Sequence, residues 1–311
     1  MRLPVTELEA AYRPTGDFRL PHHSGSLLRG LLGRALRQTG CAISDEPCRA
    51  ACLRPGLCTY SRLFDPPLPE PLPHRLLRGA TEAPPPLLPL IPRPGETHAD
   101  PLVLGVRVLG TLGDGDLQRL LAALMDIPTL RLGSAEDRME IEYLRRRRER
   151  DRILEIALGE PRQGQLRVTF ETPAWLTHKG RLHTAADLDF SSLFRHVYRR
   201  LTTLSSLYGE LLPEDEARFP ELDQLAASVQ TAAADLRVVR WERHSWEREA
   251  RHPMTGLLGS LLFDGPIGVF RPLLEAAALT FIGKSTSHGL GRMHIDVLDL
   301  PGPPPSPRPR A

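Results

Sequence analysis

Residues 270–300 read FRPLLEAAALTFIGKSTSHGLGRMHIDVLDL, and this stretch decides the fold. Its first part places apolar residues at helical spacing, and its last part alternates as a strand does. Between them lies Ile282–Arg292, IGKSTSHGLGR, with three glycines and the cations Lys284 and Arg292. Glycine permits positive φ and close backbone approach, and successive N–H groups in such a loop can form an anion site. The alternative is a tight connection whose glycines serve only the turn.

The GKST sequence in this loop does not indicate a nucleotide-binding P-loop. That motif needs a glycine five residues before Gly283, where this chain has Ala278. A P-loop also follows a strand and opens a helix, whereas here a helix precedes the loop and a strand follows it. ATP hydrolysis is therefore not expected.

The same order of elements occurs twice along the chain. In the first half, hydrophobic periodicity predicts a strand, a helix, an excursion, a strand, a helix and a strand-like segment. These elements fall at residues 5–14, 26–40, 101–110, 116–127 and 138–158. Ser24 or Ser26 can cap the first helix, and Gly40 can end it.

The second half begins near residue 164 and gives a strand, a helix, two paired strands, a helix and a strand. These elements fall at residues 165–176, 190–209, 238–248, 256–265, 270–283 and 292–300. LDQLAASVQTAAADL, residues 222–236, indicates one more helix. Two units of this order predict an α+β fold of two tandem ferredoxin-like (RRM-like) domains, each an antiparallel sheet with helices on one face.

We assign residues 1–163 to an N-terminal domain and residues 164–300 to a C-terminal domain that carries the glycine-rich loop at 283–291. The N-terminal domain holds a cysteine-rich insertion at 41–58 and a proline-rich segment at 66–93.

Proline is unusually frequent, with 31 among 311 residues against a typical ~5%. The proline-rich segment cannot be a helix or a central strand and is expected to be an extended surface segment. The proline-rich tail, residues 301–311, is expected to be disordered.

Charge does not identify a partner by itself, because the net charge is only +2. Two local clusters could attract a phosphate backbone: Arg145–Arg150, and Arg195, Arg199 and Arg200 on one predicted helix. A solvated charged face is the simpler alternative for either cluster. The N-terminus has no signal-peptide pattern and no stretch reaches the ~18 apolar residues of a membrane span, so a cytoplasmic protein with no membrane partner is expected.

The chain resembles the CRISPR-associated precursor-crRNA-processing endoribonucleases of the RAMP superfamily. The glycine-rich loop before the last strand looks like the signature of that superfamily, and LPHHSGSLLRGLLGRALR is similar to the family's first helix and its lead-in. FETPAWL, WERHSWER and GLLGSLLF then follow the family's second half in order. The resemblance covers nearly the whole chain outside the proline-rich segment and the tail.

The resemblance implies tandem ferredoxin-like domains that bind CRISPR repeat RNA and cleave precursor crRNA without a metal, as part of antiviral defence. The ribose 2′-hydroxyl attacks the adjacent phosphate and leaves 2′,3′-cyclic phosphate and 5′-hydroxyl ends. Such chemistry needs a general base, an acid for the leaving oxygen and a cation at the phosphate. Histidine suits the first two tasks because its unperturbed pKa is about 6.5.

Candidate catalytic residues are ranked by position among the eleven histidines. His22 and His23 come first, because family members often place the catalytic histidine just before the first helix and helix N-termini favour anions. His288 in the loop could stack on a base or join the chemistry, and His244 stands where we expect an aromatic residue. The alternatives are exposed loop histidines at 22–23 and simple replacement of an aromatic at the other two.

Lys284 is the best candidate for stabilising the developing charge on the phosphate. Further RNA-binding candidates are Arg29, Arg34, Gly283, Gly289, Gly291 and Arg292. For Arg29, a structural role is the alternative. Trp241 and Trp246 could stack on bases, but anchoring the strand by burial is the stronger reading.

All four cysteines lie within eighteen residues, at Cys41, Cys48, Cys52 and Cys58. A cytoplasmic protein does not rely on disulfides, and four clustered thiols suffice for one tetrahedral zinc. We predict a structural zinc, with four reduced thiols as the alternative. Because four cysteine ligands leave no open coordination position, such a zinc would not be catalytic, and no catalytic cofactor is expected.

Two other functions remain open. The first is a non-catalytic RNA-binding RAMP subunit that contacts other subunits of a CRISPR effector complex, which shares the fold and the loop. The histidines at 22–23 favour the enzyme over this alternative. The second is a zinc-dependent protein with an unrelated role, which would make the colinear resemblance a coincidence.

Overall fold

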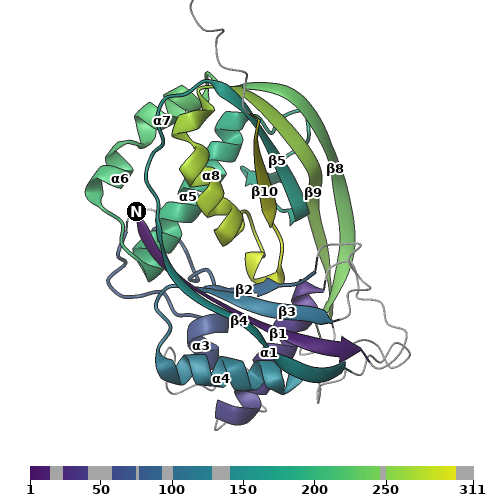
Figure 1. Ribbon diagram of the computed structural model, residues 1–311. Helices are drawn as coiled ribbons and strands as arrows, with labels where there is room; N and C mark the ends of the chain where they lie inside the picture. The colour runs from purple at the N-terminus through teal and green to yellow at the C-terminus, as the bar shows by residue number, and fades with distance from the viewer. Residues whose placement is uncertain are drawn as a thin grey trace, which may run out of the picture.

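The computed structural model describes residues 1–14, 24–40, 58–74, 77–92, 101–127, 141–245 and 250–298, which form two antiparallel sheets, each with its own helices (Figure 1). The first sheet and its helices comprise β1 (Arg2–Pro14), α1 (Gly25–Gly40), α3 (Thr59–Phe64), β2 (Leu87–Leu90), β3 (Leu102–Leu109), α4 (Asp114–Met125) and β4 (Ile141–Glu155). The second comprises β5 (Gly164–Ala174), α5 (Phe190–Tyr208), β8 (Gln230–Ser245), β9 (Ala250–Gly265), α8 (Arg271–Thr280) and β10 (Met293–Leu298).

Both sheets have the same topology. The first runs β2-β3-β1-β4 and the second β10-β5-β9-β8. The first strand of each unit lies between the third and the fourth: β1 between β3 and β4, and β5 between β9 and β10. The second strand of each unit, β2 or β8, forms an edge, and all neighbouring strands pair antiparallel. This is the ferredoxin-like arrangement, and it confirms the predicted tandem fold.

Two predicted segments differ from the structure. Helix α7 (Phe219–Ala226) covers only the start of residues 222–236, and the chain then enters β8, where Ala233 pairs with Leu262 of β9. Strand pairing overrides the helical preference of the alanines, since propensity is a weak prior.

The second difference is β2, which lies inside the proline-rich segment. Leu87 and Leu88 are fully buried on opposite faces of the strand, so residues 87–90 are not a surface segment as expected. Pro89 is tolerated because β2 is an edge strand, where a missing N–H costs no ladder bond to an outer neighbour.

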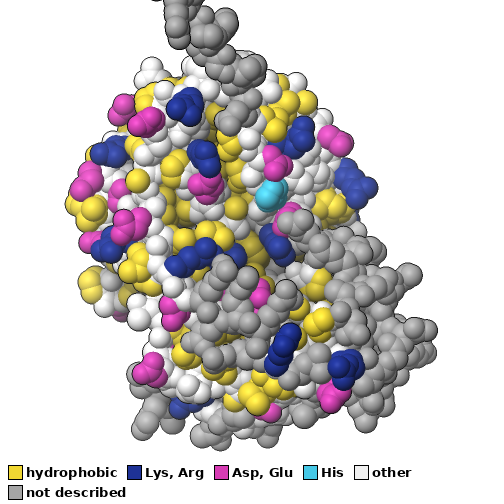
Figure 2. Space-filling model, viewed as in Figure 1, with side chains coloured by type: hydrophobic (Ala, Val, Ile, Leu, Met, Phe, Trp, Pro, Cys, Tyr) yellow, Lys and Arg dark blue, Asp and Glu magenta, His cyan; other side chains and the backbone are white. Residues whose placement is uncertain are grey.

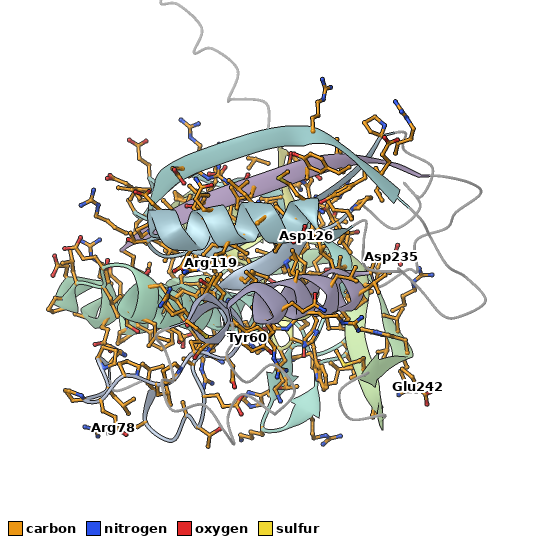
Figure 3. The ribbon with its side chains drawn as sticks, turned by 90° about the horizontal axis from the view of Figure 1, so that it is seen from below. Tyr60, Arg78, Arg119, Asp126, Asp235 and Glu242 are labelled. Carbon is orange, nitrogen blue, oxygen red and sulfur yellow. The ribbon has the colours of Figure 1, made fainter. Side chains whose placement is uncertain are left out.

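The first sheet is covered on both faces. Alternate residues of β1 point in opposite directions: Leu8 and Tyr12 pack with α1 and α4, whereas Leu3 and Val5 join the core of the second unit. Figure 3, seen from below, shows α1 and α4 side by side; Arg119 lies on α4 and Asp126 directly follows this helix. The second unit therefore docks on the face of the first sheet that α1 and α4 leave free. Among the described residues, no helix combines the length and apolar character needed to cross a membrane.

A buried ion cluster crosses this docking face. Glu7 accepts hydrogen bonds from Arg107 and Arg152, both at 2.7 Å, and Arg107 also donates to the carbonyl of Leu279 near the end of α8 at 2.5 Å. Burial opposes ionisation of Glu7, but the two guanidinium groups outweigh it and hold the pKa of Glu7 below its ordinary value. The cluster fixes how the units meet.

Glu7→Ala should lower the free energy of unfolding by about 3–5 kcal/mol, because it leaves Arg107 buried without a carboxylate. Glu9→Ala, two residues along the same face of β1, is the control and should cost under about 1 kcal/mol. Urea unfolding at pH 7 measures both. The difference should shrink below pH 4.5, where the carboxylate of Glu7 becomes protonated as the pH falls through its lowered pKa. Equal losses for the two variants would contradict this account.

Candidate functional site

The glycine-rich loop, Ile282–Arg292, lies where the two units meet. Its short helix η4 (Thr286–His288) packs against both α1 and β2 of the first unit. The contact with α1 is between backbones: a Cβ atom at Gly25 would lie 2.3 Å from the carbonyl oxygen of His288. The loop of the second unit therefore rests on the first turn of α1.

The loop is closed by its own hydrogen bonds. The N–H of Ile282 donates to the carbonyl of Gly291, whose N–H donates to the carbonyl of Pro173, both at 3.0 Å. Gly291 has φ +74°, and a Cβ there would lie 1.8 Å from the Ile282 carbonyl oxygen. The N–H groups of Lys284, His288 and Gly289 also bond within the protein. Gly291 thus serves the closure of the loop, and the bonded N–H groups would have to exchange these partners to bind an anion.

Two arginines hold the loop in place. Arg200 of α5 donates to the carbonyls of Thr280 and Phe281 and to the hydroxyl of Thr286, and burial lowers its pKa to about 10. Arg292 pairs with Glu171 at 2.7 Å and donates to the carbonyl of Ile91 in the first unit at 3.0 Å. Arg292 is therefore engaged within the protein, so its predicted contact with RNA would have to compete with these partners.

Lys284 has an exposed side chain beside an aromatic ring. Its N–H donates to the carbonyl of Trp175 at 3.0 Å, and its Nζ lies 5.8 Å from the centre of the Trp175 ring. The ammonium group of Lys284 can contact a phosphate, and the partly exposed ring of Trp175 beside it can stack on a base. Trp175 was not predicted as a site residue, and its position in FETPAWL, ahead of the 190–209 helix, gave no signal of this pairing.

Of the histidines proposed as catalytic, the structure describes the side chain of His288 alone. His288 is half-buried and its backbone touches Gly25. His22 and His23 lie outside the described residues, but they immediately precede Ser24, the buried residue before α1. His244 lies in β8, and its side chain, like all of Trp246, is outside the described residues.

The two arginines of α1 have different environments. Arg29 donates to the carbonyl of Phe64 at 2.8 Å and lies over the Phe64 ring at 4.7 Å, so it ties α1 to α3. This is the structural alternative. Arg34 is exposed and remains a candidate for RNA contact.

The zinc prediction falls mostly outside the described residues, which exclude Cys41, Cys48 and Cys52. Cys58 caps α3, with its Sγ accepting a hydrogen bond from the N–H of Ser61 at 3.2 Å. In the part of the chain that the structure describes, no group of three or more His, Cys, Asp or Glu side chains could hold a metal ion.

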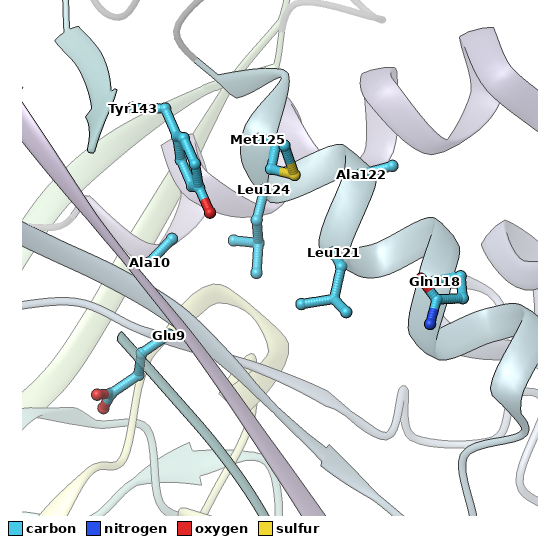
Figure 4. Close-up of a pocket in the computed structure, with 8 residues that line it drawn as sticks. All are labelled: Glu9, Ala10, Gln118, Leu121, Ala122, Leu124, Met125 and Tyr143. Atoms are coloured by element: carbon cyan, nitrogen blue, oxygen red, sulfur yellow. The ribbon is translucent and has the colours of Figure 1, made fainter. Parts of the chain in front are cut away.

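Two hollows lie away from the junction. One, of about 370 Å³, opens between α4 and β1, and Glu9 is the carboxylate among the described residues that line it (Figure 4). The other lies on the open face of the second sheet, where Arg167, Thr169 and Asp235 line it without an aromatic for base stacking. On the face seen in Figure 2, the described Lys and Arg side chains are interspersed with Asp and Glu rather than gathered together. None of these features competes with the junction as a site.

Gly25→Ala should destabilise the protein by about 1–3 kcal/mol, because the new methyl group must push the loop backbone away from α1. Gly30→Ala is the matched control in the same helix. No atom lies within 4 Å of a Cβ at Gly30, so alanine should stabilise α1 by about 0.5–1 kcal/mol. Thermal unfolding of the two variants measures the contrast, and a Gly25→Ala protein as stable as wild type would contradict the contact.

Comparison with known proteins identifies the family. A family model described as an N-terminal domain matches residues 3–168, and the model of the CRISPR-associated endoribonuclease Cas6 matches residues 168–293. No curated protein matches the chain.

Solved structures share the fold. Cas6 from Thermus thermophilus, including its product complex, is 16% identical with a TM-score of 0.51, covering 95% of this chain and at least 99% of that one. A partial Cas6-RT-Cas1–Cas2 complex is 10% identical with a TM-score of 0.58, covering 95% of this chain and 46% of that one. The second unit therefore belongs, by its family model, to the Cas6 family of CRISPR-associated endoribonucleases, and the chain as a whole shares the fold of the solved Cas6 structures.

Proposed function

We propose that this protein binds CRISPR repeat RNA and cleaves precursor crRNA at the junction between α1 and the glycine-rich loop. The observation that supports this most is the backbone contact between Gly25 and His288. In this proposal, His22 and His23, which come directly before Ser24 in the sequence, reach the same phosphate as His288 and Lys284 of the loop.

In the proposed reaction, the 2′-hydroxyl attacks the adjacent phosphorus while a general base removes its proton. The bond to the 5′-oxygen breaks, and an acid donates a proton to that leaving oxygen. His22 or His23 takes the role of base, His288 acts as acid, and Lys284 stabilises the charge that develops on the phosphate. The N-terminus of α1 adds the partial positive charge of its free N–H groups. The products carry 2′,3′-cyclic phosphate and 5′-hydroxyl ends.

A cleavage assay on the cognate repeat RNA in EDTA tests this function. Wild type should make a single cut with a cyclic-phosphate end, and the His22→Ala, His23→Ala double variant should cut about 10²–10⁴-fold more slowly, the usual contribution of general acid–base catalysis. The control is His294→Ala, because His294 is exposed on β10, and this variant should cut at the wild-type rate.

Tight binding by the wild type without any cut would reject the enzyme and leave the non-catalytic subunit of an effector complex. Full cutting by the double variant would reject His22 and His23 and move the chemistry to His288 or Lys284.

The cysteine cluster is proposed to hold one structural zinc. Protein purified without chelator should contain about one zinc per chain by elemental analysis, and a Cys48→Ser, Cys52→Ser variant should contain none and unfold at lower temperature. Wild-type protein that is stable and free of zinc would overturn the proposal.

A further inference from the structure

Three histidines that the sequence analysis did not single out join a small hairpin to α5. The hairpin consists of β6 (Thr177–His178) and β7 (Arg181–Leu182). The His183 ring lies 6.1 Å from that of His178 and 5.3 Å from that of His196 on α5, measured between centres. These ring contacts fix the hairpin against the helix.

The hairpin turn is a rigid two-residue connection. Lys179 and Gly180 both have positive φ, at +48° and +80°, as a type I′ turn requires. His178, Lys179 and Arg181 are all exposed. The turn therefore fixes the backbone from which these side chains extend into solvent.

Arg199 extends this cationic surface onto α5. It is exposed and close enough to His196 to act on its charge. The other two arginines of the predicted cluster have partners within the protein. Arg195 makes a bidentate ion pair with Asp223, and Arg200 donates hydrogen bonds to the glycine-rich loop. We call His178, Lys179, Arg181 and Arg199 the hairpin patch.

The carboxylates close to the patch have partners of their own. Asp187 accepts a hydrogen bond from the N–H of Thr184 and lies 3.3 Å from His183. Asp189 caps α5 by accepting from the N–H of Ser192. Within the described residues, Lys179, Arg181 and Arg199 make no ion pair. Three permanent cations thus remain available to an anion. His196 stays uncharged at neutral pH, because burial, His183 and Arg199 lower its pKa to about 4.

The patch continues from the glycine-rich loop along two stretches of chain. The hairpin begins just after Trp175, whose carbonyl accepts the N–H of Lys284. Arg199 directly precedes Arg200, which binds Thr286 of the loop. The hairpin patch is therefore connected to the loop by short stretches of chain, through Trp175 and through α5.

We propose that the hairpin patch binds the phosphodiester backbone of the repeat RNA outside the cleavage point. This inference rests on the proposed function and adds a contact surface to it. The cations contact phosphates without reading bases, so their contribution should be independent of sequence and sensitive to salt.

Binding of a repeat RNA with a 2′-deoxy sugar at the cleavage point, followed by fluorescence anisotropy across a salt series, tests the proposal. Lys179→Ala, Arg181→Ala should raise the Kd several-fold near 0.1 M salt. The slope of log K against log salt should flatten by about 0.7 for each lost contact if the bound segment is single-stranded. Adding Arg199→Ala removes one more contact and should flatten the slope by about 0.7 again.

The matched control is Arg167→Ala, Arg237→Ala, which removes the same charge from exposed positions of the second sheet. It should change the slope little. Hairpin variants that bind with the slope and Kd of this control would overturn the patch while the wild type still binds and cuts. A wild type that neither binds nor cuts repeat RNA would instead overturn the proposed function, and the patch with it.

Discussion

The backbone contact between the first turn of α1 and the glycine-rich loop is the constraint on which the site depends. A glycine at position 25 lets the carbonyl of His288 approach closer than any side chain would permit. On the other side of the loop, Arg200 holds its carbonyls and the hydroxyl of Thr286. A loop held from both units gives a rigid platform, and preorganised groups are what stabilisation of a transition state requires.

The two ferredoxin-like units have the same topology but contribute different parts of the structure. The first sheet offers its free face as the docking surface, through Leu3 and Val5 and through the buried cluster of Glu7 with Arg107. The second unit supplies the loop and the hairpin. Among the described residues that line the hollow on the open face of the second sheet, none is aromatic, so base stacking in that hollow is not favoured.

Most of the fold could be predicted from periodicity and element order, because long amphipathic segments such as α1 and α5 carry strong local signals. The errors lie where tertiary pairing decides. Residues 230–236 look helical but form an edge strand against β9, and the four-residue β2 is too short to give a strand pattern among the surrounding prolines. The sequence pointed to the loop but not to the roles of its residues. Arg29 and Arg292 have internal partners, and the ring contacts of His183 with His178 and His196 join positions that only the fold brings together.

The most direct test of the shared site is a crystal structure of the protein with a repeat RNA that carries a 2′-deoxy sugar at the cleavage point. The account predicts that the scissile phosphate lies between the first turn of α1 and the glycine-rich loop, within reach of Lys284 and of a histidine at 22, 23 or 288. A scissile phosphate on the open face of the second sheet, or bound by one unit alone, would contradict it.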